Sequence, residues 1–246
     1  MENRCIVCNL PKSARTTSTS DKLSKNSRKK DRLLTGGVTK FSEDERKNLE
    51  IDAIGLYSAT NAIDAAVMSN LIARLPGLSE QTLKRKPDIT DGCACCGSNL
   101  ISFAFCGKFR CVSAVELDPD HFIVLCDNFL KLETMRKIEV LPEIWLGSYL
   151  DHMTKLKQDV VFLDPPWGGS DYKNQRLLSL YLGKRHLADI IHDLCDNAGV
   201  SGTRYIVLKL PLNFDFVDMR TKLGRRSRSF FQMRMFKQYS LWCLSC

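Results

Sequence analysis

Short apolar runs alternate with amphipathic segments along most of the chain after residue 88. Continuous apolar runs are typical of strands that are covered on both faces of a parallel sheet. We expect such strands at residues 89–91, 111–116, 138–146, 160–163 and 205–210. The segments between them carry apolar residues at helical spacing, and two adjacent stretches at 229–236 and 238–244 predict an antiparallel hairpin. The pattern therefore predicts an α/β fold whose mostly parallel sheet ends in a C-terminal hairpin.

Composition divides the chain into three parts. Residues 1–40 are rich in Ser, Thr, Lys and Arg and poor in apolar residues, which predicts a disordered basic arm. Residues 41–87 have a globular composition and predict a short helical extension, ending in a loop at 76–87. Residues 88–246 hold the alternating pattern and form the main domain.

One helix of the extension can be placed from its spacing. Ile63, Val67 and Leu71 recur every four residues, with alanines between them. This spacing predicts an amphipathic helix over 61–73. Asn61 or the threonine before it is of the residue type that caps a helix N-terminus.

The net charge of +8 is concentrated at the two ends of the chain. Residues 1–40 hold ten Lys and Arg against three Asp and Glu, and residues 217–246 hold seven against one. Residues 41–216 carry 19 basic and 24 acidic residues, so the middle is not a general binder of polyanions. The basic cluster at 28–32 is consistent with nuclear import, with RNA steering or with a solvated tail.

The chain has eleven cysteines, and several of them, such as Cys111 and Cys126, fall within predicted buried elements. No apolar run reaches the roughly 18 residues of a membrane span, and no signal peptide pattern is present. We therefore expect an intracellular protein with reduced thiols and no membrane segment. Two C-x-x-C pairs, at 5–8 and 243–246, are candidates for a zinc site, but they lie at opposite ends of the chain, so we expect no metal.

The stretch 160–169 is an apolar run followed by an acid, two prolines, an aromatic residue and two glycines. Because proline cannot donate to a ladder, the strand must end at Asp164. Ligands of open α/β sheets bind outside the carboxyl ends of the strands. A carboxylate and the indole of Trp167, held there by stiff prolines, suit a planar substrate that bears an amine. The alternative is an ordinary strand-ending turn, with Asp164 as a cap and Trp167 in the core.

An exocyclic purine amine is a poor nucleophile because its lone pair is delocalised into the ring, so its methylation is mostly a matter of positioning. We expect Asp164 to accept one N–H of such an amine and the carbonyl of Pro165 to accept the other, while Trp167 fixes the ring plane. A base that is already methylated at N7 carries positive charge. Its stacking on indole would gain about 1–2 kcal/mol from a cation–π interaction, which favours that base over an unmodified one.

Two further acids end the first and second predicted strands. Asp91 opens a turn of small residues that includes Gly97 and leads into a helix, whose free N–H groups would face a ligand. A purely structural turn is the alternative, because a dinucleotide fingerprint would show three glycines. Glu116 ends the second strand, where α/β nucleotide folds bind ribose hydroxyls. We expect Asp118 to cap the next helix rather than to bind a ligand.

Together these features resemble class I S-adenosylmethionine-dependent methyltransferases, and specifically the trimethylguanosine synthase family, over residues 50–246. The most specific match is the stretch 164–172, which looks like the family signature [DS]-P-P-W-G-G-P-x-Y. Residues 91–99 are similar to its D-x-F-C-G-x-G-G-N loop, 116–119 to its D-I-D-P segment and 56–60 to its W-F-S-V-T segment. The resemblance implies a Rossmann-like class I methyltransferase sheet, S-adenosyl-L-methionine as the cofactor and a 7-methylguanosine cap as the substrate. It also implies that the helical extension at 41–87 covers the active site.

The resemblance also implies roles for individual residues. Trp167 would stack on 7-methylguanine, and Tyr172 would lie near the cap. Asn213 matches the last position of a family L-P-R-N segment and would contact the substrate. The positions that carry over to the cofactor are Tyr57, Ser58, Thr60, Asp91, Gly97, Asn99, Glu116, Ser148 and Asp164.

The chain departs from the family pattern at Cys95, Ser98, Ser148 and Leu212. The first two replace glycines of the cofactor loop. Ser148 stands where the family usually has an acid that holds the adenine amine, and Leu212 stands where it has an arginine for a cap phosphate. Phosphate contact must then come from Lys209 or from the basic stretch 225–228.

We therefore expect methyl transfer from S-adenosylmethionine to the exocyclic N2 amine of a 7-methylguanosine cap, with Asp164, Pro165 and Trp167 as the catalytic residues. The product would be 2,7-dimethylguanosine, and a second transfer to 2,2,7-trimethylguanosine is left open. Two other functions remain open: N6-adenine or internal guanine-N2 methylation of nucleic acid, and a catalytically silent cap-binding protein. We expect a nuclear monomer whose partner is capped RNA or a cap nucleotide, with no metal and no membrane.

Overall fold

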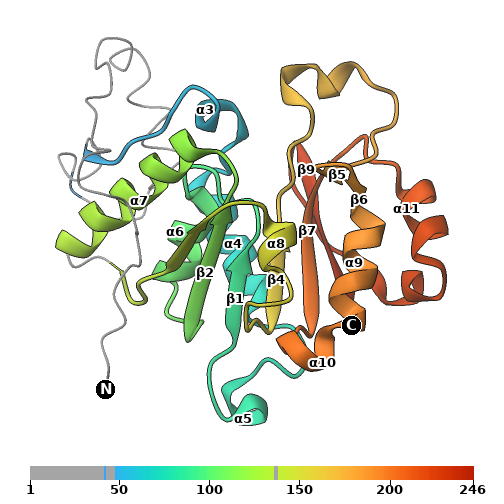
Figure 1. Cartoon of the computed structure of the whole chain (residues 1–246), viewed down its shortest axis with the longest axis horizontal. Coiled ribbons are helices and arrows are strands. Elements are labelled where there is room, and N and C mark those ends of the chain that lie inside the picture. Colours follow the sequence, from blue (N-terminus) through green and yellow to red (C-terminus); the bar gives the residue numbers. More distant parts are fainter. Residues whose placement is uncertain (1–41, 43–47, 136–137) are drawn as a thin grey trace.

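A single seven-stranded sheet organises the protein. The computed structural model describes residue 42, residues 48–135 and residues 138–246 (Figure 1). The strand order is β3-β2-β1-β4-β7-β9-β8. The strands are β1 Asp88–Asp91, β2 Cys111–Glu116, β3 Glu143–Leu146, β4 Val160–Leu163, β7 Tyr205–Pro211, β8 Phe230–Met235 and β9 Tyr239–Ser245. The predicted basic arm at 1–40 lies outside the described residues.

Strands β3, β2, β1, β4 and β7 are parallel, and β9 pairs antiparallel with both β7 and β8. The predicted fold class, a mostly parallel sheet with a C-terminal antiparallel hairpin, is therefore confirmed. The hairpin is irregular, because the register shifts between Gln232 and Arg234. Its second strand, β9, inserts between β7 and β8 and so carries the C-terminal chain into the sheet.

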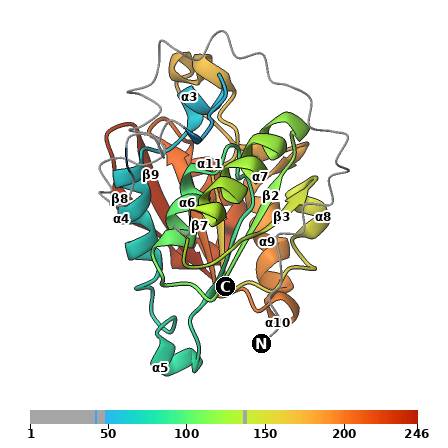
Figure 2. The same ribbon diagram turned by 90° about the vertical axis from the view of Figure 1, so that its left-hand side faces the viewer.

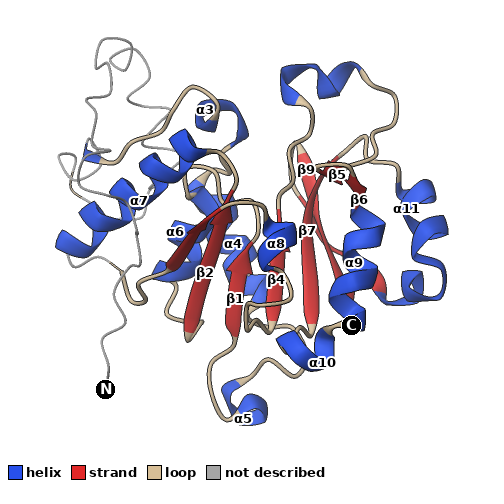
Figure 3. Ribbon diagram, viewed as in Figure 1, coloured by secondary structure: helices blue, strands red, loops and turns tan. Residues whose placement is uncertain are grey.

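Helices cover both faces of this sheet (Figures 2 and 3). Val160 and Phe162 of β4 belong to a core with α4, α6 and α7, whereas Val161 and Leu163 belong to a second core with α8, α9 and α11. Because successive side chains of a strand point to opposite faces, burial on both sides requires the continuous apolar run seen in the sequence. The bounds are α4 Ala62–Ile72, α6 Ser98–Phe105, α7 Pro119–Thr134, α8 Tyr149–His152, α9 Leu187–Asp196 and α11 Phe216–Leu223.

The remaining elements are short. They are α3 Gly55–Ser58, α5 Glu80–Leu83, η4 Gly169–Asn174, β5 Tyr181–Leu182, β6 Arg185–His186, α10 Ala198–Ser201 and η5 Gly224–Ser229. The one-turn helix α5 falls within 76–87, which was expected to be a loop, and β3 is shorter than the strand expected at 138–146. None of the helices in the described residues is long and apolar enough to cross a membrane.

Helix α4 forms where the sequence predicts it, but it buries a different face. Its cap is Asn61, whose side chain accepts a hydrogen bond from the backbone N–H of Asp64 at 3.0 Å. Ile63, expected on the apolar face, is 59% exposed, whereas Met68 is fully buried. The helix packs against α6, and small residues make this contact. The hydroxyl groups of Ser69 and Ser102 form a hydrogen bond of 2.7 Å between the two helices. Spacing alone could not distinguish this face from the predicted one.

One disulfide differs from the expected reduced thiols. Cys195 of α9 is bonded to Cys246, with their Cα atoms 4.8 Å apart. This pairing also removes Cys246 from the candidate zinc site, and Cys243 is a buried free thiol. No group of three or more potential metal ligands occurs among the described residues.

Candidate active site

The predicted site residues converge at one edge of the sheet. Asp91 and Glu116 end the parallel strands β1 and β2, and Asp164 follows β4 directly. Strand order reverses between β1 and β4, since β2 lies on one side of β1 and β4 on the other. Such a switch point is where an open α/β sheet leaves a crevice for a ligand. The three carboxylates therefore come from the strand ends that border this crevice.

Asp91 is fully buried, and one of its carboxylate oxygens has no hydrogen-bond partner. The other oxygen accepts a bond from the backbone N–H of Cys93 at 3.2 Å. Burial raises the pKa of Asp91 to about 8, and the nearby Asp164 and Glu116 add to this rise. A buried acceptor without a partner is costly in a folded protein, which points to a ligand that supplies a donor or a positive charge.

Two more acceptors without partners lie close to this region. They are Oδ1 of Asn99 at the start of α6 and Oγ1 of Thr60. Ser98 links the two segments, because its hydroxyl accepts the backbone N–H of Thr60 at 3.1 Å. The serine that replaces a family glycine thus holds the helical extension against the loop. The set of acceptors fits S-adenosylmethionine, whose α-ammonium brings the missing donors.

The loop between β1 and α6 has the backbone shape of a ligand cradle. Gly97 adopts φ +93°, a conformation that favours glycine, and a Cβ there would lie 2.6 Å from Cδ1 of Leu125. Cys95 also has positive φ, at +48°, in a position where the resembling family has glycine. Its backbone N–H donates to Oε2 of Glu116 at 2.6 Å.

Glu116 is already engaged by the backbone on both sides. Its Oε1 accepts a hydrogen bond from the backbone N–H of Asp118 at 2.8 Å, and its Oε2 accepts one from the backbone N–H of Cys95. Each carboxylate oxygen has two lone pairs, so Glu116 retains acceptor capacity for ribose hydroxyls. His121, which the sequence did not single out, lies with Nε2 2.9 Å from Asp52 and Nδ1 3.7 Å from Glu116. Asp118 caps α7 as expected.

The helical extension lies over this loop. A Cβ at Gly55 of α3 would meet Sγ of Cys96 at 2.7 Å, which shows how closely the two segments approach. Ser58 has its hydroxyl 3.7 Å from Sγ of Cys95, and Tyr57 is 84% exposed. Thr60 is buried beside Ser98. Ser58 and Thr60 are thus placed at the loop, whereas the ring of Tyr57 points largely to solvent.

Ser148 has a local role in the structure. Its hydroxyl accepts the N–H of Leu150 at 3.3 Å and so caps α8. Gly147, with φ +141°, donates its N–H to the carbonyl of Glu116 at 2.8 Å and ties β3 to β2 at this edge. The residue that stands in place of the family acid therefore lies close to Glu116, but it offers a hydroxyl rather than a carboxylate.

Asp164 forms a buried ion pair with Lys209 of β7. The Nζ of Lys209 lies 2.6 Å from Oδ2 of Asp164, and the lysine side chain is only 3% exposed. Burial raises the pKa of Asp164, although Lys209 and a hydrogen bond with Asn99 oppose the rise. Lys209 was expected to contact phosphate. The structure instead buries it against the carboxylate, because β7 is a central strand whose residues face the two cores.

Trp167 stands at the centre of an aromatic cluster. Its ring lies 5.1 Å from that of Tyr172 at an interplanar angle of 74°, and 6.4 Å from that of Tyr239. The Nζ of Lys209 lies 5.1 Å from the centroid of Trp167 and 4.8 Å from that of Tyr239. The indole N–H is buried and has no acceptor. Pro165 is buried between Asp164 and this cluster.

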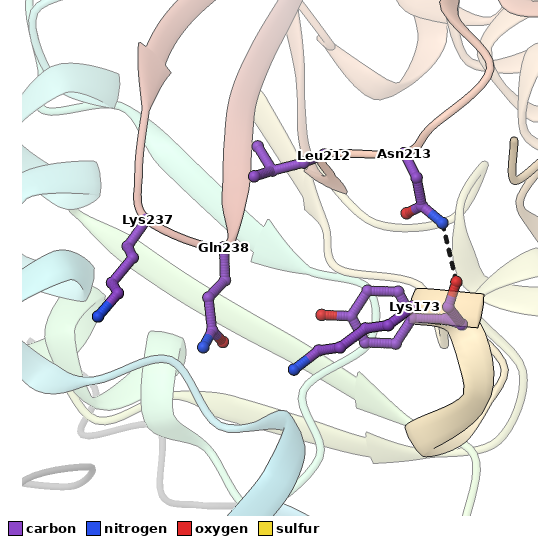
Figure 4. Close-up of a pocket in the computed structure, with 6 residues that line it drawn as sticks. Lys173, Leu212, Asn213, Lys237 and Gln238 are labelled. Carbon is purple, nitrogen blue, oxygen red and sulfur yellow. Dashed lines mark hydrogen bonds between the residues drawn. The ribbon is translucent and has the colours of Figure 1, made fainter. Parts of the chain in front are cut away.

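A pocket of about 270 Å³ opens beside Tyr172. Its lining residues are Tyr172, Lys173, Leu212, Asn213, Lys237 and Gln238. Lys237 and Gln238 come from the turn between β8 and β9 and face Lys173 across the opening (Figure 4). Positive charge thus flanks Leu212, the position where the resembling family has arginine.

Asn213 does not present its amide nitrogen to this pocket. The amide donates to the carbonyls of Tyr172 and Gln175, each at 2.8 Å (Figure 4). It therefore fixes η4 and with it Tyr172. In the basic stretch 225–228, Arg226 pairs with Asp196 and so is also engaged within the protein. No periodicity in the sequence could have placed Lys237 beside Tyr172, because only the hairpin brings them together.

The chain is similar in sequence to a known family and to individual proteins. The profile of the family described as RNA cap guanine-N2 methyltransferase matches residues 87–234, more than half of the chain. An uncharacterized protein of Acanthamoeba polyphaga mimivirus is 33% identical over 132 residues, which cover 54% of this chain and 49% of that protein. Trimethylguanosine synthase of Schizosaccharomyces pombe is 25% identical over 157 residues, which cover 62% of each chain. The chain thus matches 49% and 62% of the lengths of these two relatives.

A solved structure shows the same fold. The putative methyltransferase from Porphyromonas gingivalis W83 has a TM-score of 0.55 at 13% sequence identity, covering 88% of this chain and 54% of that one. The resemblance seen in the sequence is confirmed by the family match, and the Rossmann-like sheet by the structural neighbour. The chain belongs to the RNA cap guanine-N2 methyltransferase family.

Proposed function

We propose that the protein methylates the exocyclic N2 amine of guanine in a 7-methylguanosine RNA cap, giving 2,7-dimethylguanosine and, after a second transfer, 2,2,7-trimethylguanosine. The observation that carries the proposal is the position of Asp164 and Trp167. They place a carboxylate and an aromatic plate at the switch point of the sheet, next to the acceptors expected for the cofactor. This arrangement suits a planar base whose amine must be aligned.

The residues that would hold S-adenosylmethionine are Asp91, Asn99, Glu116 and the backbone around Gly97. When bound, it supplies an electrophilic methyl group that leaves its sulfonium as the new N–C bond forms. The protein residues provide the positioning. Asp164 accepts an N–H of the amine, and its remaining lone pairs suffice for this because Lys209 and Asn99 occupy only part of the carboxylate.

The indole of Trp167, which we call the platform, orients the base, and the ring of Tyr172 lies at one edge of it. The T-shaped contact between the two rings fixes the indole plane, and Asn213 fixes the segment that carries Tyr172. The proton that the amine loses passes to solvent after transfer. The base needs no covalent activation, so its correct placement is the main contribution of the site.

The pocket beside Tyr172 supports a substrate that carries phosphates. Lys173 and Lys237 line it next to the exposed Leu212. A cap base bound on Trp167 would lie beside this pocket, since Tyr172 contacts both. We infer that the phosphate chain of the cap leaves through this opening, with the two lysines in place of the family arginine.

The test compares two nucleotides that differ only in the amine. The protein is incubated with S-adenosylmethionine and either 7-methyl-GTP or 7-methylinosine triphosphate, which lacks the N2 amine, and products are resolved by mass. We expect one or two added methyl masses on 7-methyl-GTP and none on the inosine analogue. Equal methylation of both would exclude N2 as the acceptor. Cofactor binding without product would indicate a larger nucleic-acid substrate, and no cofactor binding would indicate a silent cap-binding protein.

A further inference from the structure

The ion pair between Lys209 and Asp164 places an ammonium group against the platform on which the base should stack. The ammonium is 2.6 Å from the carboxylate and within 5.1 Å of the centroids of both Trp167 and Tyr239. Its side chain is 3% exposed, so water screens it little. The face of an aromatic ring attracts cations within about 6 Å, and Lys209 lies within that range of two rings.

Two other carboxyl groups, those of Asp91 and Asp64, lie near this part of the site. Asp91 is largely protonated at neutral pH because burial raises its pKa to about 8. The carboxylate of Asp64 accepts a hydrogen bond from the hydroxyl of Tyr239 at 2.8 Å. Asp164 and Lys209 form the ion pair beside Trp167, and their two charges offset each other.

Base methylation at N7 is recognised chiefly through charge, because the methyl group makes guanine a cation. In a site with an aromatic plate and a carboxylate that lacks a counter-ion, two interactions would favour that cation. One is the cation–π interaction with the ring face, and the other is the attraction to the carboxylate. Here the ammonium already polarises the indole and offsets the carboxylate. The cationic base therefore gains little over neutral guanine.

We propose that Lys209 is a specificity-determining residue that lowers the preference of the base site for 7-methylguanine, so that neutral guanine nucleotides are also accepted. The inference rests on the proposed function, because it concerns the same base on the same platform. It extends the substrate class from the methylated cap to guanine nucleotides that carry no N7 methyl group.

The direction of the effect depends on the charge of Asp164 when Lys209 is replaced. In Lys209→Met, a cationic base takes the place of the missing counter-ion, so Asp164 is ionised in that complex and attracts 7-methylguanine more strongly than guanine. If Asp164 stayed neutral in both complexes, the two lost charges would offset each other and the preference would not change, which is the outcome that overturns the inference.

The experiment measures the affinities of 7-methyl-GTP and GTP by titration calorimetry in the presence of S-adenosylhomocysteine, for the full chain and three variants. The ratio of the two dissociation constants is the readout. We expect wild type to prefer 7-methyl-GTP by less than about tenfold, and Lys209→Met to raise that ratio by roughly 5- to 30-fold, the factor that matches a cation–π interaction of about 1–2 kcal/mol. Lys209→Arg keeps the charge and should leave the ratio within about threefold of wild type.

Lys173→Met is the matched control, since it removes a lysine from the phosphate pocket rather than from the platform. It should weaken both nucleotides alike and leave the ratio unchanged. An unchanged ratio in a folded Lys209→Met variant overturns the inference. If that variant does not fold, the wild-type ratio decides, and a preference of several hundredfold for 7-methyl-GTP overturns it equally. Failure of both nucleotides to bind to wild type overturns the proposed function itself.

Discussion

The cofactor half and the base half of the site treat buried charge in opposite ways. On the side of β1, Asp91 is buried with one oxygen unpartnered, and the acceptors of Asn99 and Thr60 are likewise unsatisfied. On the side of β4 and β7, Asp164 has a strong internal partner in Lys209 at 2.6 Å. The cofactor half has buried acceptors that only a ligand can hydrogen-bond or neutralise. In the base half, the protein itself supplies the partner of the buried carboxylate.

The difference indicates where each ligand obtains its binding energy. A cationic cofactor gains from the unsatisfied acceptors around Asp91, so charge contributes to its affinity. The base meets a compensated ion pair and an aromatic cluster, so shape and stacking contribute more than charge. Changes in one half should therefore leave the other largely intact, and the following predictions test that separation from the largest effect to the smallest.

Replacement of the platform should have the largest effect. Trp167→Ala removes the ring that orients the base, and we expect the kcat/KM for 7-methyl-GTP to fall by at least about 100-fold. Cofactor affinity, measured by calorimetry, should change by less than about threefold. Trp167→Phe is the control that retains an aromatic plate and should keep part of the activity. Parallel loss of cofactor binding in a folded Trp167→Ala variant would contradict the separation of the two halves.

Asp91 should make cofactor affinity depend on pH. Its pKa of about 8 means that the carboxyl must lose a proton before it can pair with an ammonium. We expect the affinity for S-adenosylmethionine to rise between pH 6 and pH 8 by up to about tenfold per pH unit. In Asp91→Asn the affinity should be lower at pH 8 and nearly independent of pH. A wild-type profile that is equally flat would show that Asp91 does not face the ammonium.

The same residue should lower the stability of the ligand-free protein. The pKa of Asp91 is higher in the folded than in the unfolded chain, so stability falls as pH rises from about 4 through about 8. We expect ligand-free Asp91→Asn to be more stable than wild type at pH 8, on the order of a few kcal/mol, with the gap closing toward pH 4. Denaturant unfolding at the two pH values measures this. A less stable variant at pH 8 would mean that the carboxylate is satisfied in the folded state.

If phosphates bind in the pocket beside Tyr172, the affinity for 7-methyl-GTP should depend on the salt concentration. The double variant Lys173→Met, Lys237→Met should weaken 7-methyl-GTP but not the nucleoside 7-methylguanosine, and reduce the slope of log affinity against log salt by about 1–2. Lys184→Met is the control, because that exposed lysine lies at the turn between β5 and β6, outside the pocket. Equal weakening of nucleotide and nucleoside would place the lysines away from the phosphates.

The smallest effect is expected in the cofactor loop. Cys95 has φ +48°, which a glycine adopts without strain. Cys95→Gly should therefore raise the free energy of unfolding by about 0.5–1 kcal/mol. Cys93→Gly is the matched control, since Cys93 does not have positive φ and glycine there should destabilise the protein. Destabilisation by both variants would show that the Cys95 side chain contributes packing that outweighs the strain.

The sequence predicted the elements whose cause is local. The run 160–163 and the prolines after Asp164 determine where β4 begins and ends, and the acid-Pro turn at Asp118 determines the start of α7. The carboxyl ends of parallel strands meet at one edge, so the convergence of Asp91 and Glu116 also followed from the pattern.

The features that the sequence could not predict depend on distant contacts. Lys209 alternates with apolar residues in β7, and only the register with β4 and the approach of Asp164 explain why a lysine is buried there. The buried face of α4 depends on the small residues of α6 rather than on its own spacing. Lys237 reaches the pocket through a hairpin turn, and Asn213 donates to backbone carbonyls instead of a ligand because η4 folds back over it.

The most direct measurement follows the methyl group itself. A short RNA with a 7-methylguanosine cap is incubated with the protein and S-adenosylmethionine labelled in the methyl group, and the RNA is digested to nucleosides, with the cap opened to release its base. Our account predicts that the label appears in 2,7-dimethylguanosine or 2,2,7-trimethylguanosine, and that Trp167→Ala abolishes it while still binding the cofactor. Label in adenosine or in internal guanosine, or none despite bound cofactor, would contradict the assignment of this site to the cap.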